Sequence, residues 1–379
     1  MLDVPLRVVL REWGRIGCLG FGGPPAHIAL LRELVVDRRE WLSAEEVEDA
    51  IAACNLLPGP ASTQLAIFTA WRVRGPVGAI AGGLAFILPG LIAILALSAL
   101  FLSASPPDWV RGAGEGAGAA VAAVAVQAGL ALMPASWKRA APAPAPPAAT
   151  TEGPVTGRAR WVVYAVLGGI AAAVAGPWVV LVLLACGGYE LLRRRAAAFA
   201  WPVLIATANL GGLAWVALKV GALSYGGGFV IIPLMQGDAV DRHHWMTGEQ
   251  FLSAVALGQV TPGPVTHTVA AVGFAAAGVG GALLAAAVAF APSFAFVLLG
   301  APRFDRLRAH PDARAFLDGA GPAAIGAILG SSVALAGELT EPWQAAVLAA
   351  AAVALLALRR GVVETLVAAG VTGALIATL

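Results

Sequence analysis

The sequence is poor in charged residues and in cysteine. Of its 379 residues, 12% are charged and 59% are hydrophobic, and the mean hydropathy is +0.82. Soluble domains carry about 25% charged residues, so this composition excludes an ordinary cytosolic enzyme and a disordered chain. The net charge of +2 is too small to drive binding to nucleic acid. The three cysteines lack CxxC spacing, which excludes a disulfide framework and a thiolate metal site.

Long runs without Asp, Glu, Lys or Arg take up most of the chain. A membrane-spanning helix needs about 20 mostly apolar residues, and many of the runs reach or approach this length. The runs are 50–71, 75–107, 116–137, 161–189, 196–218, 220–237, 250–302, 319–337, 342–358 and 365–379. They predict an all-α polytopic membrane protein, with the lipid bilayer as its partner.

Two segments are of a different kind. Residues 1–17 space Arg7, Arg11 and Arg15 four apart, which predicts an amphipathic helix on the membrane surface and not a cleavable signal. Residues 134–160 are rich in Pro and Ala and show no periodicity. They predict a flexible loop outside the bilayer, to which we assign no site.

The chain contains an internal repeat. A shift of 204 residues aligns about 50 positions without a gap, so that Gly-Gly at 22–23 falls on 226–227 and Pro-Gly-Pro at 58–60 falls on 262–264. A DR-x-x-W motif matches at the same shift. Chance matches of Ala and Gly do not explain three motifs at one shift. We therefore predict two homologous domains, residues 1–196 and 197–379.

The basic residues predict that the two copies have opposite orientations. Short cytoplasmic loops are rich in Lys and Arg. In the first copy the basic segments are 72–75, 134–160 and 193–195, and in the second copy they are 301–314 and 359–360. In each copy these basic segments alternate with turns that carry few or no basic residues. The first copy begins and ends with a basic segment, whereas the second begins and ends with a turn that has none, so the order is reversed. This pattern predicts inverted repeats with a cytoplasmic N-terminus and a periplasmic C-terminus. Secondary transporters often have this architecture and bind substrate between the repeats.

The glycine motifs LGFGGPPAH at 19–27 and LSYGGGFVIIP at 223–233 interrupt helices within apolar sequence. Free backbone N–H groups and the positive end of the following helix favour an anion site. Close helix packing is an equally weighted alternative. The candidate binding residues of these motifs are Gly22, Gly23, Pro24 and His27 in the first copy, and Gly226 and Gly227 in the second.

The Pro-Gly-Pro motifs form the second pair of breaks. Proline ends a helix, and a broken helix at membrane depth must be buried in protein or line a cavity. A kinked helix capped by hydroxyl groups is the alternative, but the repetition of the motif favours a binding site. The candidate residues are Asn55, Pro58, Gly59, Pro60, Ser62, Thr63 and Gln64, then Gln259, Thr261, Pro262, Gly263, Pro264, Thr266 and His267.

Titratable residues accompany both pairs of motifs. His27 and His267 are candidate proton carriers or hydrogen-bond donors, although a buried packing role is more common. Ser43-x-x-Glu46 and Thr247-x-x-Gln250 fit the capping box. Glu45 and Glu249 therefore start helices in the favoured interpretation, and proton coupling is the minority one. Arg38 and Arg242 are expected in solvated loops, with a role at the entrance for anions as the alternative.

Motifs for metal and nucleotide chemistry are missing. The sequence has no HExxH and no Walker A motif. We therefore predict no metal site, no cofactor and no ATP hydrolysis, so that any transport is driven by ion gradients or by the membrane potential.

With these motifs the sequence resembles the chromate ion transporter family. The first half carries the resemblance in FGGPPAHIALL, VVDRREWLS and NLLPGPASTQLAIFTAWRVRGPVGAIAGGLAFILPG, and the second half in YGGGFVIIPLMQGDAVDRHHWMTGEQFLSAVALGQVTPGPV. The resemblance implies two homologous halves of opposite orientation and export of chromate across the bacterial inner membrane, which gives chromate resistance. Sulfate, a close analogue of chromate, is the expected competitor, and a homodimer is an open alternative.

Three other functions are alternatives. The first is import or exchange of sulfate or another anion. The second is an intramembrane enzyme that pairs His27 or His267 with Ser62; it is disfavoured because Thr63 occupies the position of His267 in the first copy. The third is a structural scaffold, which has no need of duplicated polar breaks.

The inverted topology can be tested by labelling introduced cysteines from either side of the membrane. Because basic loops stay in the cytoplasm, cysteines near Arg194 and Arg306 are expected to be cytoplasmic. Cysteines near Ala104 and at the C-terminus are expected to be periplasmic. Labelling of positions 194 and 104 from the same side would contradict the inverted repeat.

Overall fold

The computed structural model describes residues 4–54, 59–103, 105–140, 154–174, 179–194, 211–224, 231–300 and 311–379. Within these ranges every regular element is a helix, which confirms the predicted all-α class. Residues 141–153 of the Pro/Ala-rich segment 134–160 and residues 196–210 of the predicted span 196–218 lie outside the described residues. The predicted loop is wrong at both ends of this segment, because residues 134–139 continue the helix Asp108–Arg139 and residues 154–160 begin the helix Pro154–Val174. Alanine favours helix, and a proline in the first turn of a helix needs no N–H.

The helices follow each other along the chain in two comparable series. The first is α1 (Leu6–Leu19), α2 (Pro24–Arg32), η1 (Glu33–Arg38), α3 (Ala44–Cys54), α4 (Ala61–Phe101), α5 (Asp108–Arg139), α6 (Pro154–Val174) and α7 (Val179–Arg194). The second is α8 (Gly212–Leu223), α9 (Ile231–Gln236), η3 (Gly237–Arg242), α10 (Gly248–Val260), η4 (Val265–His267), α11 (Thr268–Gly300), α13 (Pro311–Gly337), α14 (Pro342–Ala352), η6 (Val353–Ala357) and α15 (Val362–Ala377).

Among the described residues, five helices are long and apolar enough to cross a membrane. They are Ala61–Phe101, Asp108–Arg139, Gly157–Val174, Val265–Gly300 and Ala315–Gly337. The long apolar run 250–302 is divided, as predicted, at its Pro-Gly-Pro motif, where α10 ends and α11 begins after a short turn. Other apolar runs form shorter helices, among them α8 and α15.

Helices α4 and α11 are each two arms joined at a tight turn. Gly75 has φ 64° and Gly278 has φ 60°, a left-handed conformation that glycine adopts without strain. In a straight helix residues 12 apart are about 18 Å from each other, yet an added Cβ on Gly82 would lie 2.5 Å from the Cβ of Ala70. The chain therefore reverses at Gly75. The basic segment 72–75, which the sequence predicts to be a short loop, ends at this turn.

Unusual backbone features recur at the shift seen in the sequence. The π-helical turn η1 (33–38) is matched by η3 (237–242). Positive φ angles recur in pairs: Glu40 with His244 and Gly59 with Gly263 at a shift of 204 residues, and Gly75 with Gly278 at a shift of 203. This recurrence agrees with two copies of one unit.

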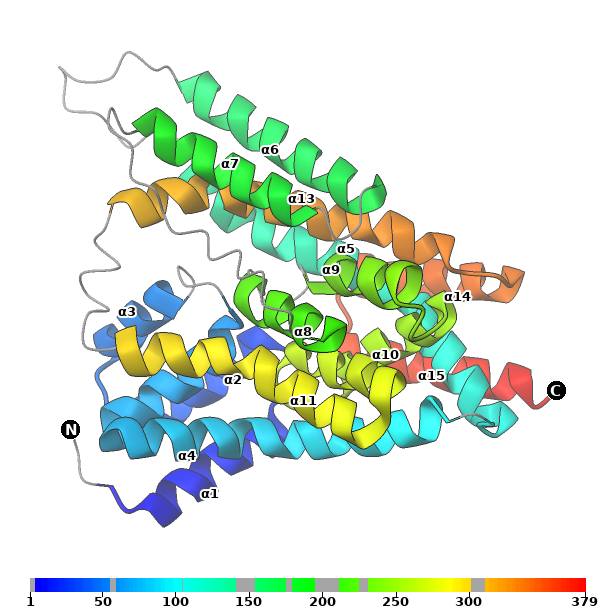
Figure 1. The fold of residues 1–379 in the computed structure, drawn as a ribbon, viewed down its shortest axis with the longest axis horizontal. Coiled ribbons are helices and arrows are strands. Elements are labelled where there is room, and N and C mark those ends of the chain that lie inside the picture. The colour runs from blue at the N-terminus through cyan, green and yellow to red at the C-terminus, as the bar shows by residue number, and fades with distance from the viewer. Residues whose placement is uncertain are drawn as a thin grey trace.

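The two hairpin helices pack together at the centre of the molecule. α1 packs along α4, and α8 packs along α11. α5 contacts α10, α13 and α15, while α6 and α7 cover α13. In Figure 1 the long arm of α4 runs from left to right, and the long arm of α11 runs from right to left. The halves therefore contribute their long arms in antiparallel directions.

Helix α1 is held firmly against this centre. Its residues Val9, Trp13 and Ile16 are buried, and the indole Nε1 of Trp13 donates a 2.7 Å hydrogen bond to the carbonyl of Ala66. The amphipathic helix predicted from the arginine spacing is thus present, with one face against α4. Its placement on the membrane surface stays a prediction.

Small residues allow α6 and α13 to touch through their backbones. An added Cβ on Gly168 would overlap the carbonyl of Ala323, and one on Gly326 would overlap the carbonyl of Ala165. In a bilayer, packing contacts of this kind drive helix association because lipid is as apolar as the helices.

A larger side chain at this contact is expected to weaken the fold. Gly326→Val must separate α6 from α13, and overpacking of this kind costs about 1–3 kcal/mol. Thermal unfolding in detergent, followed by tryptophan fluorescence, measures the loss. Gly337→Ala is the control, because an added Cβ there meets nothing within 4 Å. Equal stability of the two variants would contradict the close packing.

Candidate functional site

The glycine break of the first half is bonded to the Pro-Gly-Pro turn of the second half. The carbonyl oxygen of Gly20 accepts a 2.9 Å hydrogen bond from the backbone N–H of Gly263. The same oxygen lies 2.8 Å from Nε2 of His27. Because a carbonyl only accepts, Nε2 carries the proton. We call this contact and the two Pro-Gly-Pro turns the central junction.

Glycine and proline explain why the chain breaks between α1 and α2. Gly22 and Gly23 have φ angles of 97° and 74°, which side chains with a Cβ adopt only with strain. Pro24 then occupies the first turn of α2, where its missing N–H is not needed. A side chain at Gly20 would lie 2.6 Å from Cδ2 of His27, so the fully buried imidazole rests directly on the backbone.

The Pro-Gly-Pro turn of the second half is packed against α4. α10 ends at Val260, and Gly263 has φ 92°. An added Cβ on Gly90 would overlap the carbonyl of Pro262 and would lie 2.6 Å from Cε1 of His267. The ring of His267 is fully buried, with its edge toward Phe290 at 5.3 Å between ring centroids.

The turn of the first half has a different set of neighbours. Gly59 has φ 120°, and α4 begins after Pro60. An added Cβ on Gly59 would lie 2.5 Å from Nε2 of Gln64, 3.3 Å from Oγ of Ser293 and 3.4 Å from the carbonyl of Gly221. This turn therefore also faces elements of the other half. Asn55, Pro58, Gly226 and Gly227 lie outside the described residues.

Buried polar atoms without a hydrogen-bond partner gather at these turns. Among the described residues they include Oγ1 of Thr63, Nε2 of Gln259, Oγ1 of Thr266 and Oγ of Ser293. The backbone of Ile87 is near His267, but neither ring nitrogen makes a hydrogen bond of ordinary geometry within the described chain. An unmet buried polar group costs about 1–3 kcal/mol. Several of them in one region indicate a site for a polar ligand.

Sequence reasoning missed three residues of the junction, namely Gly20, Gly90 and Ser293. Gly90 follows Pro89 and Ser293 follows Pro292, and the two prolines align in the repeat after a gap of one residue. That alignment was the one feature of the sequence that pointed to Gly90 and Ser293. It did not reveal that the residue after each proline faces the Pro-Gly-Pro turn of the other half.

Ser62 and His27 lie together, as the enzymatic alternative requires. Nδ1 of His27 is 3.3 Å from Oγ of Ser62. The other ring nitrogen, however, is bonded to the Gly20 carbonyl and not to a carboxylate. A hydrolytic triad orients its histidine with a third group of this acidic kind, and here a backbone oxygen takes that place.

The charged candidates lie away from the central junction. Glu45 is exposed in the first turn of α3, and Glu249 accepts a 2.6 Å hydrogen bond from Thr340. Both predicted capping boxes are confirmed, at Ser43 with Glu46 and at Thr247 with Gln250.

Arg38 and Arg242 require a correction. Both are exposed, but they end the π-helical turns η1 and η3 and do not lie in loops. Each turn continues the preceding helix with the i→i+5 hydrogen bonds of a π-helix. The sequence pattern does not distinguish such a turn from a loop. Thr261, which was grouped with the site, uses its hydroxyl on the Gly258 carbonyl at 3.4 Å.

Long apolar helices around two broken, polar turns define a multi-pass membrane transport protein. Residues 8–191 and 211–377 match the protein family described as Chromate transporter. The chain belongs to this family.

Curated relatives cover most of the chain. It is 31% identical to the Chromate transport protein of Cupriavidus metallidurans, over 96% of this chain and 91% of the relative. It is 30% identical to the Chromate transport protein of Pseudomonas aeruginosa, over 86% and 80%, and 29% identical to a Probable chromate transport protein of Synechococcus elongatus, over 87% and 84%. No solved structure matches the chain significantly.

A side chain at Gly90 is expected to disrupt the junction. In Gly90→Ala the added methyl group overlaps the carbonyl of Pro262, so the turn must move and the Gly20–Gly263 hydrogen bond lengthens. We expect a lower melting temperature and loss of transport. Gly280→Ala serves as the control, since an added Cβ there meets nothing within 4 Å. Wild-type behaviour of Gly90→Ala would show that α4 and the turn are not tightly packed.

Proposed function

We propose that the chain is a secondary transporter that exports chromate from the cytoplasm across the inner membrane, and that the oxyanion binds at the central junction. The observation that carries this proposal is the set of buried, unpartnered polar groups at the two Pro-Gly-Pro turns. Relatives named as chromate transport proteins support the choice of substrate.

Chromate suits this set of groups. It is a tetrahedral dianion near neutral pH, and each of its four oxygens accepts hydrogen bonds. Gln259 and His267 bring N–H groups, while Thr266 and Ser293 bring hydroxyl groups, and all of these are neutral donors. A site without a fixed cation binds a dianion weakly enough to release it, which transport requires.

Inverted repeats give this site its two-sided access. The antiparallel long arms of α4 and α11 support the inversion (Figure 1), as do the recurring backbone features. In Figure 1 the start of α1 and the end of α15 lie at opposite ends of the molecule, in keeping with a cytoplasmic N-terminus and a periplasmic C-terminus. Rocking of one half against the other exposes a site at their interface to each side in turn.

Removal of the turns is expected to abolish transport. In Pro262→Ala/Pro264→Ala the helix can run through the break, and the backbone donors at the turn then bond within the helix. The measurement is uptake of labelled chromate by oriented proteoliposomes under imposed gradients, with sulfate as competitor. Pro134→Ala is the control, because Pro134 is an exposed proline inside α5.

Loss of a single donor should have a smaller effect. Gln259→Leu removes one hydrogen bond and is expected to weaken chromate binding by about tenfold, or about 1.4 kcal/mol. If the double proline variant transports as well as the parent, the turns serve packing and the substrate binds elsewhere.

A further inference from the structure

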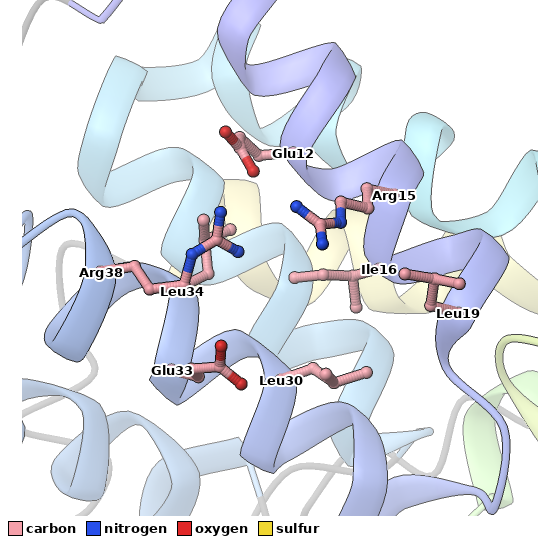
Figure 2. Close-up of a pocket in the computed structure, with 8 residues that line it drawn as sticks. All are labelled: Glu12, Arg15, Ile16, Leu19, Leu30, Glu33, Leu34 and Arg38. Carbon is pink, nitrogen blue, oxygen red and sulfur yellow. The ribbon is translucent and has the colours of Figure 1, made fainter.

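An open pocket of about 70 Å³ lies between α1 and the continuous α2–η1 helix. Four of its lining residues are charged, namely Glu12, Arg15, Glu33 and Arg38. Figure 2 shows the guanidinium groups of Arg15 and Arg38 pointing toward each other across the pocket, one from α1 and the other from η1. The pocket is thus bounded by two cations on separate elements.

The charges in this pocket do not cancel. Glu12 forms an ion pair with Arg39, which neutralises it. Arg15, Arg38 and Glu33 take part in no ion pair within the part of the chain that the structure describes. Two free guanidinium groups therefore face one free carboxylate. The pocket has a net positive charge, which attracts anions.

The pocket adjoins the end of α1 that precedes the central junction. Its apolar lining includes Ile16 and Leu19, and the next residue along the chain is Gly20. The carbonyl of Gly20 accepts hydrogen bonds from Gly263 and His27. An anion held by Arg15 and Arg38 is therefore separated from the junction by the last turn of α1.

At the corresponding place in the second half the cations are paired with a carboxylate. At the repeat shift Arg15 becomes Lys219, Leu34 becomes Asp238 and Arg38 becomes Arg242. Lys219 forms an ion pair with Asp238, whose side chain is only 1% exposed. Nη1 of Arg242 is 3.8 Å from the same carboxylate. Both cations of the second half therefore lie within 4 Å of a carboxylate, whereas Arg15 and Arg38 form no such ion pair within the described residues.

We propose that the pocket of the first half is a capture subsite for the oxyanion, with Arg15 and Arg38 as its cationic ligands. Guanidinium groups bind tetrahedral oxyanions through paired N–H donors. Both arginines are exposed, so salt screens the interaction and the anion can move on. The proposal rests on the proposed transport of an oxyanion and adds to it the place where that anion is first bound.

The test is the dependence of chromate uptake on chromate concentration in proteoliposomes. In Arg15→Gln/Arg38→Gln the apparent KM is expected to rise by about tenfold, with little change in the maximal rate, because the loss is in capture and not in translocation. The dependence of KM on ionic strength should flatten. Glu33→Gln should lower KM, since it removes the opposing charge.

Two controls separate capture from general charge effects. Arg11→Gln removes an exposed arginine of α1 that does not line the pocket, and its KM should match that of the parent. Lys219→Met/Asp238→Leu removes the ion pair of the second half as a unit, which avoids an unpaired buried charge, and it should leave KM unchanged.

An unchanged KM in both the double arginine variant and Glu33→Gln would overturn the subsite, as would an equal rise in Arg11→Gln. If the parent protein itself fails to take up chromate, the proposed function fails instead. The two failures are therefore distinguishable.

Discussion

The rest of the structure depends on the need to satisfy backbone groups where helices are broken inside the protein. At membrane depth water is not at hand to bond a free N–H or carbonyl. The molecule meets this need across its two halves, because the Gly20 carbonyl at the first glycine break accepts the N–H of Gly263 at the second Pro-Gly-Pro turn. His27 completes the arrangement by bonding to the same oxygen. This contact between the two breaks is therefore also one of the contacts between the halves.

Such a junction forms only where backbones approach closely. Gly90 leaves room for the Pro262 carbonyl and His267, and Gly221 leaves room for the carbonyl of Ala289. The two Pro-Gly-Pro turns nevertheless have different surroundings. One faces Gly90 and the imidazole of His267, while the other faces Ser293. The repeated backbone turns therefore have different hydrogen-bonding side chains as neighbours.

The segments η1 and η3 likewise have the same backbone conformation but different side chains. η1 and η3 are both π-helical turns, but Leu34 in one corresponds to Asp238 in the other. That carboxylate pairs with Lys219, whereas Arg15 at the equivalent place has no such partner among the described residues. One half therefore presents unpaired cations to solvent, and the other half buries a neutral pair.

The sequence by itself determined the class, the repeat and the positions of the breaks. Apolar runs indicate helices, Gly and Pro indicate where helices end or begin, and the constant shift indicates the repeat. These signals are local in the sequence. The ends of α10, the start of α2 and both capping boxes could therefore be predicted. The sequence could not predict which of the breaks contact each other, because the hydrogen bond from Gly263 to Gly20 joins residues far apart in the chain. Ser293 and Gly90 were missed for the same reason, since their role arises only when α4 and α11 cross. The π-helical form of the segments ending at Arg38 and Arg242 also required the structure. Tertiary packing decided these features because side chains from both halves must share one buried space, and no periodicity in either half encodes that geometry.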